Sequence, residues 1–285
     1  MRVLVTNDDG VASPGLHALA RAIVAGGHDV IVVAPDREMS GTAASIGQAH
    51  IEAGIDSERV DLPGLDGVPS YALAGPPGLC VLTARLGGFG DPPDMVVSGI
   101  NPGCNTGRAV LHSGTVGAAL TAANFGARGL AVSIDVSTRH LHEGGGTIAV
   151  GDGDEARAEL VEDVEAGAHW TTAATLAASA ASWLASDAAP PGTVLNLNVP
   201  NVPLDRVAGA RSATLAPFGT VRSSVVEPAP DGGRLQVEFH PTDKDLPPES
   251  DTALVAAGFV AVTALSGIGI DDRVELSAVL DLAPV

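Results

Sequence analysis

Strand-like and helix-like segments alternate along the first half of the chain, and this alternation constrains the fold more than any other feature. Residues 2–7 and 29–35 are short runs rich in Val, Leu and Ile, which is typical of buried strands. Between them, residues 14–25 predict a helix with Ser13 at its N-cap, Pro14 at its first position and a Gly pair after its end. The pattern continues with expected strands at 94–101, 130–135 and 193–199 and expected helices at 77–86, 116–125 and 171–185. It predicts an α/β fold with a doubly wound, mostly parallel, Rossmann-like sheet and a smaller β-rich C-terminal part.

The pattern also divides the chain into three parts. Residues 1–204 form the expected core, interrupted by an acidic, Gly-rich insertion at about 136–169. Strand-like runs at 223–226 and 234–240 flank Asp231-Gly232-Gly233, a turn signal for a β-hairpin, so 205–250 is expected to form a hairpin arm. Residues 251–285 are expected to return to the core through a strand at 259–265 and to end in a tail.

The charge balance argues against one class of partner. The chain carries 15 Lys and Arg against 34 Asp and Glu, a net charge of −19, which repels nucleic acid at long range. Aromatic residues make up only 3% of the chain, so few rings are available for base stacking. We therefore expect no nucleic-acid duplex as a partner. A small anionic substrate would need a local attraction, either from a bound cation or from backbone N–H groups at a helix start.

Other features bear on the compartment. No stretch of about 18 apolar residues is free of charge, Gly and Pro, so no membrane span is expected. The chain enters a strand-like run at once, without a basic stretch before an apolar segment, so no secretory signal is expected. Two cysteines, Cys80 and Cys104, make no disulfide framework. These observations predict a cytoplasmic protein with free thiols.

Three polar, Gly-punctuated loops follow the expected strands, at 7–10, 35–41 and 98–105. In open α/β sheets, ligands bind beyond the carboxyl ends of the strands, so we expect these loops to meet at one edge. In the first loop, Asp8 and Asp9 repel each other unless a cation or hydrogen bonds compensate. Either one caps the following helix region and the other is solvated, or both bind a metal. The oxygen-rich loops favour a hard cation, and no HExxH or CxxC spacing supports zinc.

A fourth motif, His112-Ser113-Gly114-Thr115 followed by Val-Gly-Ala-Ala, runs into an expected helix. Its small residues allow close approach of a ligand, and a helix start presents free N–H groups and partial positive charge. The motif predicts a phosphate site or, alternatively, an ordinary N-cap at Ser113 or Thr115. It is not a Walker loop, because no Gly-Lys-Ser/Thr follows.

These motifs together resemble the SurE family. The resemblance rests on six collinear blocks across about 1–265: MRVLVTNDDG with SPG at 13–15, VAPDR with SG at 40–41, VVSGIN with Gly103 and Asn105, HSGTVGAA at 112–119, LNLNVP at 195–200, and SD at 250–251 with GFVAVT at 258–263. His112 stands where the family commonly has Tyr.

The resemblance implies a phosphatase that hydrolyses nucleoside 5'- and 3'-monophosphates, with possible action on short polyphosphate. It implies one divalent metal ion per subunit, Mg²⁺ or Mn²⁺, held by Asp8, Asp9, Ser40 and Asn101. It further implies a phosphate pocket made by Asn105, Ser113, Gly114 and Thr115. Catalysis is assigned to Asp8 and Asp9, and a homodimer or homotetramer is expected to form through the hairpin arm.

Some points stay open at this level. The nucleophile is either water or one of the two Asp carboxylates, and His112 either protonates the leaving group or packs at the helix start. The chain has Gly-Pro-Pro-Gly-Leu-Cys at 75–80 where the family usually has Gly-Thr-Pro-x-Asp-Cys. This departure raises the alternative of a catalytically degenerate, metal-binding scaffold. A dinucleotide-binding oxidoreductase is disfavoured because the first turn lacks GxGxxG.

Overall fold

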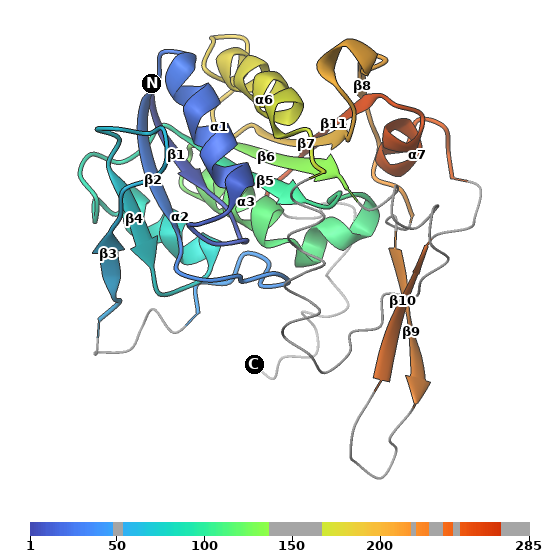
Figure 1. The fold of residues 1–285 in the computed structure, drawn as a ribbon, viewed down its shortest axis with the longest axis horizontal. Coiled ribbons are helices and arrows are strands. Elements are labelled where there is room, and N and C mark those ends of the chain that lie inside the picture. The colour runs from blue at the N-terminus through green and yellow to red at the C-terminus, as the bar shows by residue number, and fades with distance from the viewer. Residues whose placement is uncertain (48–53, 137–166, 218–220, 228–235, 242–245, 269–285) are drawn as a thin grey trace, which may run out of the picture.

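The computed structural model describes residues 1–47, 54–136, 167–217, 221–227, 236–241 and 246–268. Its centre is a nine-stranded sheet with the strand order β3-β4-β2-β1-β5-β6-β7-β11-β8 (Figure 1). The strands are β1 Arg2–Thr6, β2 Asp29–Pro35, β3 Ser57–Arg59, β4 Ser70–Leu73, β5 Met95–Pro102, β6 Arg128–Asp135, β7 Val194–Pro200, β8 Ala210–Ser212 and β11 Val260–Leu265.

Most neighbouring strands run parallel. β1 pairs in parallel with β2 and β5, and the parallel pairing continues through β6 to β7 and from β2 to β4. The antiparallel pairs lie toward the two ends, β3 against β4 and β11 against β7. The central strands are buried along almost their whole length, as expected for a sheet that is covered on both faces. The predicted doubly wound, mostly parallel α/β fold is confirmed.

Helices cover both faces of this sheet. The helices are α1 Pro14–Ala25, α2 Pro77–Arg85, α3 Gly114–Asn124, α6 Trp170–Leu184 and α7 Asp251–Ala256. One face is covered by α1 and α6, which pack on each other, and the opposite face by α2 and α3 (Figure 1). In α1 the spacing of Leu16, Leu19 and Ile23 places them on one fully buried stripe. In α6 alanines form that stripe, so the helix packs closely on the sheet.

The sequence of β7 divides its side chains between the two faces. Successive residues of a strand point to opposite sides, so Leu195 and Leu197 join the core on the α6 side. Asn196 and Asn198 point to the other side, where both are fully buried and both bind Asn105. The alternation of Leu and Asn therefore gives β7 one apolar face and one face of amide groups.

A separate two-stranded sheet follows the core. β9 Val221–Glu227 and β10 Gln236–Pro241 pair antiparallel with each other, at the place where the sequence predicted a hairpin (Figure 1). Its predicted turn at 231–233 lies outside the described residues, as does most of the insertion predicted at about 136–169. Within the described part of the chain, no helix is both long and apolar enough to cross a membrane.

Candidate functional site

The loops singled out in the sequence follow strands that lie side by side. β1 and β5 are parallel neighbours, with Thr6 opposite Ser98, and β2 lies on the other side of β1. The polar residues after these three strands therefore emerge at the same edge of the sheet. The second loop is held to the first, because the Met39 N–H donates to the carbonyl oxygen of Asp8 at 2.7 Å and the Val11 N–H donates to that of Pro35 at 2.8 Å.

Asp8 is almost fully enclosed at this edge. Only 3% of the residue is exposed, and the Thr115 hydroxyl donates to its Oδ1 at 2.6 Å. Burial raises the pKa of Asp8 above its ordinary value, while the hydrogen bond from Thr115 and the backbone N–H groups of Thr115 and Gly114 act in the opposite direction. Asp8 is thus a desolvated carboxylate held at the start of α3.

Gly114 makes this contact possible. A Cβ atom at position 114 would lie 2.7 Å from Oδ2 of Asp8 and 2.8 Å from its Cβ atom, closer than such atoms approach in proteins. The preceding Ser113 is the N-cap of α3, and its hydroxyl oxygen accepts a hydrogen bond from the Val116 N–H at 3.1 Å. Ser113 is therefore the N-cap of α3, as one of the two interpretations of the motif expected. The hydroxyl hydrogen of Ser113 is not used in this bond and stays available to a ligand.

The contact between Asp8 and α3 bears on the predicted phosphate pocket. Thr115 has one hydroxyl hydrogen, and that hydrogen is directed at Asp8. The N-terminus of α3, predicted to attract a phosphate, faces the carboxylate of the chain's own Asp8. The sequence predicted Asp8 for a metal site and Gly114 and Thr115 for a phosphate site. The structure brings these three residues together in one contact.

Ser40 and Asn101 stand at the rim of this arrangement. Ser40 is exposed, and its hydroxyl donates to Oε1 of Glu38 at 3.0 Å. Asn101 is half-buried at the end of β5, and its Nδ2 donates to the Gly103 carbonyl oxygen at 2.6 Å. This bond orients the amide and leaves Oδ1 as its acceptor atom. Among the described residues, neither side chain makes a hydrogen bond with the Asp8 carboxylate.

Asn105 is fixed from β6 and β7. Its N–H donates to Asn198 Oδ1 at 2.8 Å, and its carbonyl oxygen accepts from the side-chain amides of Asn196 and Asn198 at 2.8 and 3.0 Å. Its own Nδ2 donates to the Ser133 hydroxyl at 2.9 Å. No role was predicted from the sequence for Asn196, Asn198 or Ser133. The signal that identifies the two asparagines is their alternation with leucine in a strand that is otherwise apolar.

The donor atoms at this edge fit a hard cation. Within the described ranges, no group of three or more His, Cys, Asp or Glu side chains gathers to hold a metal ion. A cation here would therefore combine the carboxylates of Asp8 and half-buried Asp9 with neutral oxygens such as those of Ser40 and Asn101. Such oxygen-only sets suit Mg²⁺ or Mn²⁺, and the desolvated carboxylate of Asp8 is a group that a cation would stabilise.

The structure also describes the surroundings of His112, Leu79 and Cys104. His112 is exposed at the end of the 3₁₀ helix η1 Gly107–His112. Leu79 stands at the position where the resemblance led us to expect Asp. It is buried in the core between α2 and the sheet, with 3% of the residue exposed. Burial, with Asp135 and Asp251 nearby, raises the pKa of the Cys104 thiol well above its ordinary value, which disfavours the reactive thiolate.

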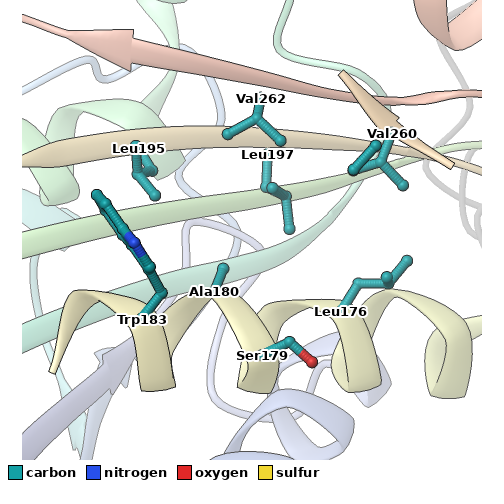
Figure 2. A pocket seen from close by; sticks show the side chains of 9 residues that line it. Leu176, Ser179, Ala180, Trp183, Leu195, Leu197, Val260 and Val262 are labelled. Carbon is teal, nitrogen blue, oxygen red and sulfur yellow. The ribbon is translucent and has the colours of Figure 1, made fainter. Parts of the chain in front are cut away.

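An apolar groove of about 340 Å³ lies elsewhere, between α6 and the sheet (Figure 2). Figure 2 shows Trp183 and Leu176 of α6 facing Leu195 and Leu197 of β7 and Val260 and Val262 of β11. These leucines point away from Asn196 and Asn198 on the same strand. The groove has no ionisable side chain in its lining and takes no part in the polar site.

The fold and the site define a class: a doubly wound α/β protein with an oxygen-rich, acidic site at the carboxyl edge of its sheet. The sequence profile described as survival protein SurE matches residues 3–220, and the chain belongs to the SurE family. It is 34% identical over 267 residues to the 5'-nucleotidase SurE of Aeromonas hydrophila subsp. hydrophila, covering 93% of this chain and 92% of that protein. It is 37% identical over 209 residues to the 5'-nucleotidase SurE of Xanthomonas oryzae pv. oryzae, covering 73% and 67% of the two chains.

A solved structure shares the fold. The crystal structure of the SurE protein from Aquifex aeolicus superposes with a TM-score of 0.71 at 24% identity, over 99% of this chain and 98% of that one. The resemblance seen in the sequence is confirmed as family membership.

Proposed function

We propose that this protein is a phosphomonoesterase that hydrolyses nucleoside 5'- and 3'-monophosphates, and also short polyphosphate, with one divalent metal ion per subunit. The relatives named as 5'-nucleotidases support the 5' activity. The observation that carries the proposal is the buried carboxylate of Asp8, held against the N-terminus of α3 at the carboxyl edge of the sheet.

The roles divide among residues in reach of this carboxylate. Asp8 and Asp9, with the oxygens of Ser40 and Asn101, would hold Mg²⁺ or Mn²⁺. The cation would supply charge stabilisation at the phosphoryl oxygens. Thr115 orients Asp8 through its hydroxyl, and Ser113 offers its hydroxyl hydrogen to the phosphate. Asn105, held on both sides of its peptide by β7, completes the proposed phosphate pocket.

The helix start has a defined task in this proposal. The N–H groups at Gly114 and Thr115 face Asp8 in this structure, and they would stabilise the negative charge that builds on the equatorial oxygens. The attacking group is a water molecule beside Asp8 and Asp9, and direct attack by one of these carboxylates is the alternative. His112, exposed at the end of η1 and next to Ser113 in the sequence, would be the group that gives a proton to the leaving alkoxide.

The test is phosphate release from a panel of 5'- and 3'-nucleotides and tripolyphosphate with Mg²⁺, with Mn²⁺ and with EDTA. We expect release from the nucleotides with metal and none with EDTA. Asp9→Asn should lower kcat/KM strongly with either metal, whereas Asp36→Asn, an exposed carboxylate in the neighbouring loop, should leave it within twofold of wild type. Full activity of Asp9→Asn would remove that residue from the metal site.

No release under any condition would favour the degenerate scaffold instead. The loop at 75–80 would then be the first cause to examine, because buried Leu79 supplies no carboxylate to a substrate.

We also propose that the protein forms a homodimer or homotetramer in the cytoplasm, with 205–250 as the oligomerisation arm. The support is that β9 and β10 pair only with each other in the described sheets, and an isolated two-stranded hairpin is marginally stable in water. Light scattering coupled to size exclusion, comparing wild type with a chain lacking 218–245, would measure the assembly and the contribution of the arm.

A further inference from the structure

We propose that Asp251 is a positioning residue that holds the loop between Asn105 and Ser113 in its working conformation and links it to the base of the hairpin arm. The inference rests on the proposed function, because this loop carries part of the proposed phosphate pocket. Asp251 is the first residue of α7 and is fully buried. It belongs to the Ser-Asp motif at 250–251, for which the sequence predicted no role.

Three backbone N–H groups from different parts of the chain converge on its carboxylate. Oδ2 accepts from Gly107 at 2.8 Å, and Oδ1 accepts from Ala216 at 2.9 Å and from Thr252 at 2.8 Å. No ion pair with a basic side chain is observed for it in the described part of the chain. A buried carboxylate without a cation is costly unless such donors satisfy it, so the three N–H groups and Asp251 fix one another.

The Gly107 N–H is the start of η1, the short helix that leads to the N-cap of α3. Thr106 occupies the N-cap position of η1, but its side chain makes no capping hydrogen bond, and its Oγ1 has no partner among the described residues. The cap is supplied instead by Asp251, 144 residues further along the chain. The conformation of η1 therefore depends on α7 rather than on its own sequence.

The second oxygen connects this loop to the arm. Ala216 lies two residues beyond Thr214, which forms an isolated bridge with Ser250, and it precedes the strand β9. One carboxylate thus joins the entrance of the arm to the entrance of the phosphate loop. A displacement of the arm that draws Ala216 away would disturb the acceptor that also holds Gly107.

The variant Asp251→Asn can keep two of these three hydrogen bonds and removes the third, with little change in the shape of the side chain. An amide has one acceptor oxygen, whereas the carboxylate has an acceptor at each end. The amide oxygen can turn to the N–H groups of Ala216 and Thr252, which are two of the three donors. The NH₂ group then faces the Gly107 N–H, and because an NH₂ group cannot accept that hydrogen bond, the cap of η1 is lost. The matched control is Ser250→Ala, which removes the N-cap bond to the Ala253 N–H in the same helix, and Ser250 makes no hydrogen bond with η1 among the described residues.

The first readout is limited trypsin cleavage after Arg108, an exposed residue within η1. We expect cleavage there to be about tenfold faster in Asp251→Asn than in wild type or Ser250→Ala, with no change after Arg85 in α2. This measurement does not depend on any activity, so it decides the positioning role even if the proposed function fails. Equal cleavage of Asp251→Asn and Ser250→Ala at Arg108 would overturn the proposal.

The second readout is kinetic, with a nucleoside 5'-monophosphate and Mn²⁺. Loss of loop positioning should raise KM about tenfold in Asp251→Asn and lower kcat less, whereas Ser250→Ala should keep the wild-type KM. If Asp251→Asn does not fold, hydrogen exchange of the wild-type Gly107 amide decides instead. Protection of that amide equal to that of Ala216 supports the clamp, and exchange at the rate of an unstructured peptide refutes it.

Discussion

Replacing Thr115 with Val tests the contact at the centre of the site. Val keeps the shape and both branches of the side chain but removes the hydroxyl that donates to Asp8 at 2.6 Å. Thr115 is fully buried and Asp8 nearly so, so no bulk water replaces the lost donor. A hydrogen bond to a charged group contributes about 1.5–3 kcal/mol, and we expect the free energy of unfolding to fall by that amount. For a chain of this size, the midpoint temperature should fall by about 3–12 °C.

The assay is urea denaturation in EDTA of wild type, Thr115→Val, Asp8→Asn and the double variant. This cycle isolates the interaction between the two side chains from other consequences of each substitution. We expect a coupling energy of about 1.5–3 kcal/mol. The variant Thr115→Ser keeps the hydroxyl and loses only a methyl group, so it should retain the coupling. A coupling energy below about 0.5 kcal/mol would refute the contact as a determinant of the site.

Two further predictions concern packing and thiol chemistry. Gly114→Ala should lower the free energy of unfolding by about 1–3 kcal/mol and abolish turnover, because the added Cβ atom meets Asp8. The control is Gly267→Ala, whose added Cβ atom meets no atom within 4 Å. This control should be neutral in urea denaturation and in phosphate release. Burial raises the pKa of Cys80 to about 12 and that of Cys104 well above its ordinary value, which lowers the reactive thiolate fraction at pH 8. Both thiols of the native protein should therefore react slowly with a disulfide reagent, and both should react fast once the protein is unfolded in guanidinium. Fast reaction of both thiols in the native state would contradict this.

The sequence was sufficient for the main elements of the fold because each carries a local signal. Pro14 and the Gly pair mark the ends of α1, and the apolar runs of β1 and β2 are unmistakable. The predicted bounds of α3 and α6 differ from the observed ones by one or two residues, which reflects the weak signals at helix ends. The helix α7 and the strand β8, of six and three residues, were not predicted because they are too short for a periodic pattern.

The candidate site was predictable as a set of loops but not as a set of contacts. The rule that ligands bind at the carboxyl edge identified the loops at 7–10, 35–41 and 98–105, and the family resemblance then named Asp8, Ser40 and Asn101 within them. It did not indicate that Thr115 donates to Asp8, because that bond depends on how closely α3 approaches β1. Nor did it assign Asp251, whose bond to Gly107 spans 144 residues. The roles of these residues in metal and phosphate binding stay predictions.

The long sequence separations within the site have a consequence for the order in which it forms. Asp8 meets Thr115 across 107 residues, Asn105 meets Asn198 across 93, and Gly107 meets Asp251 across 144. Closing such loops costs entropy before their contacts are gained, which makes chains of this kind slow to fold. On a ribosome the first loop would be made long before Asp251 emerges. The N-terminal part of the sheet can then be complete while η1 still lacks its cap, so the ability to bind phosphate should be the last property that the new chain acquires.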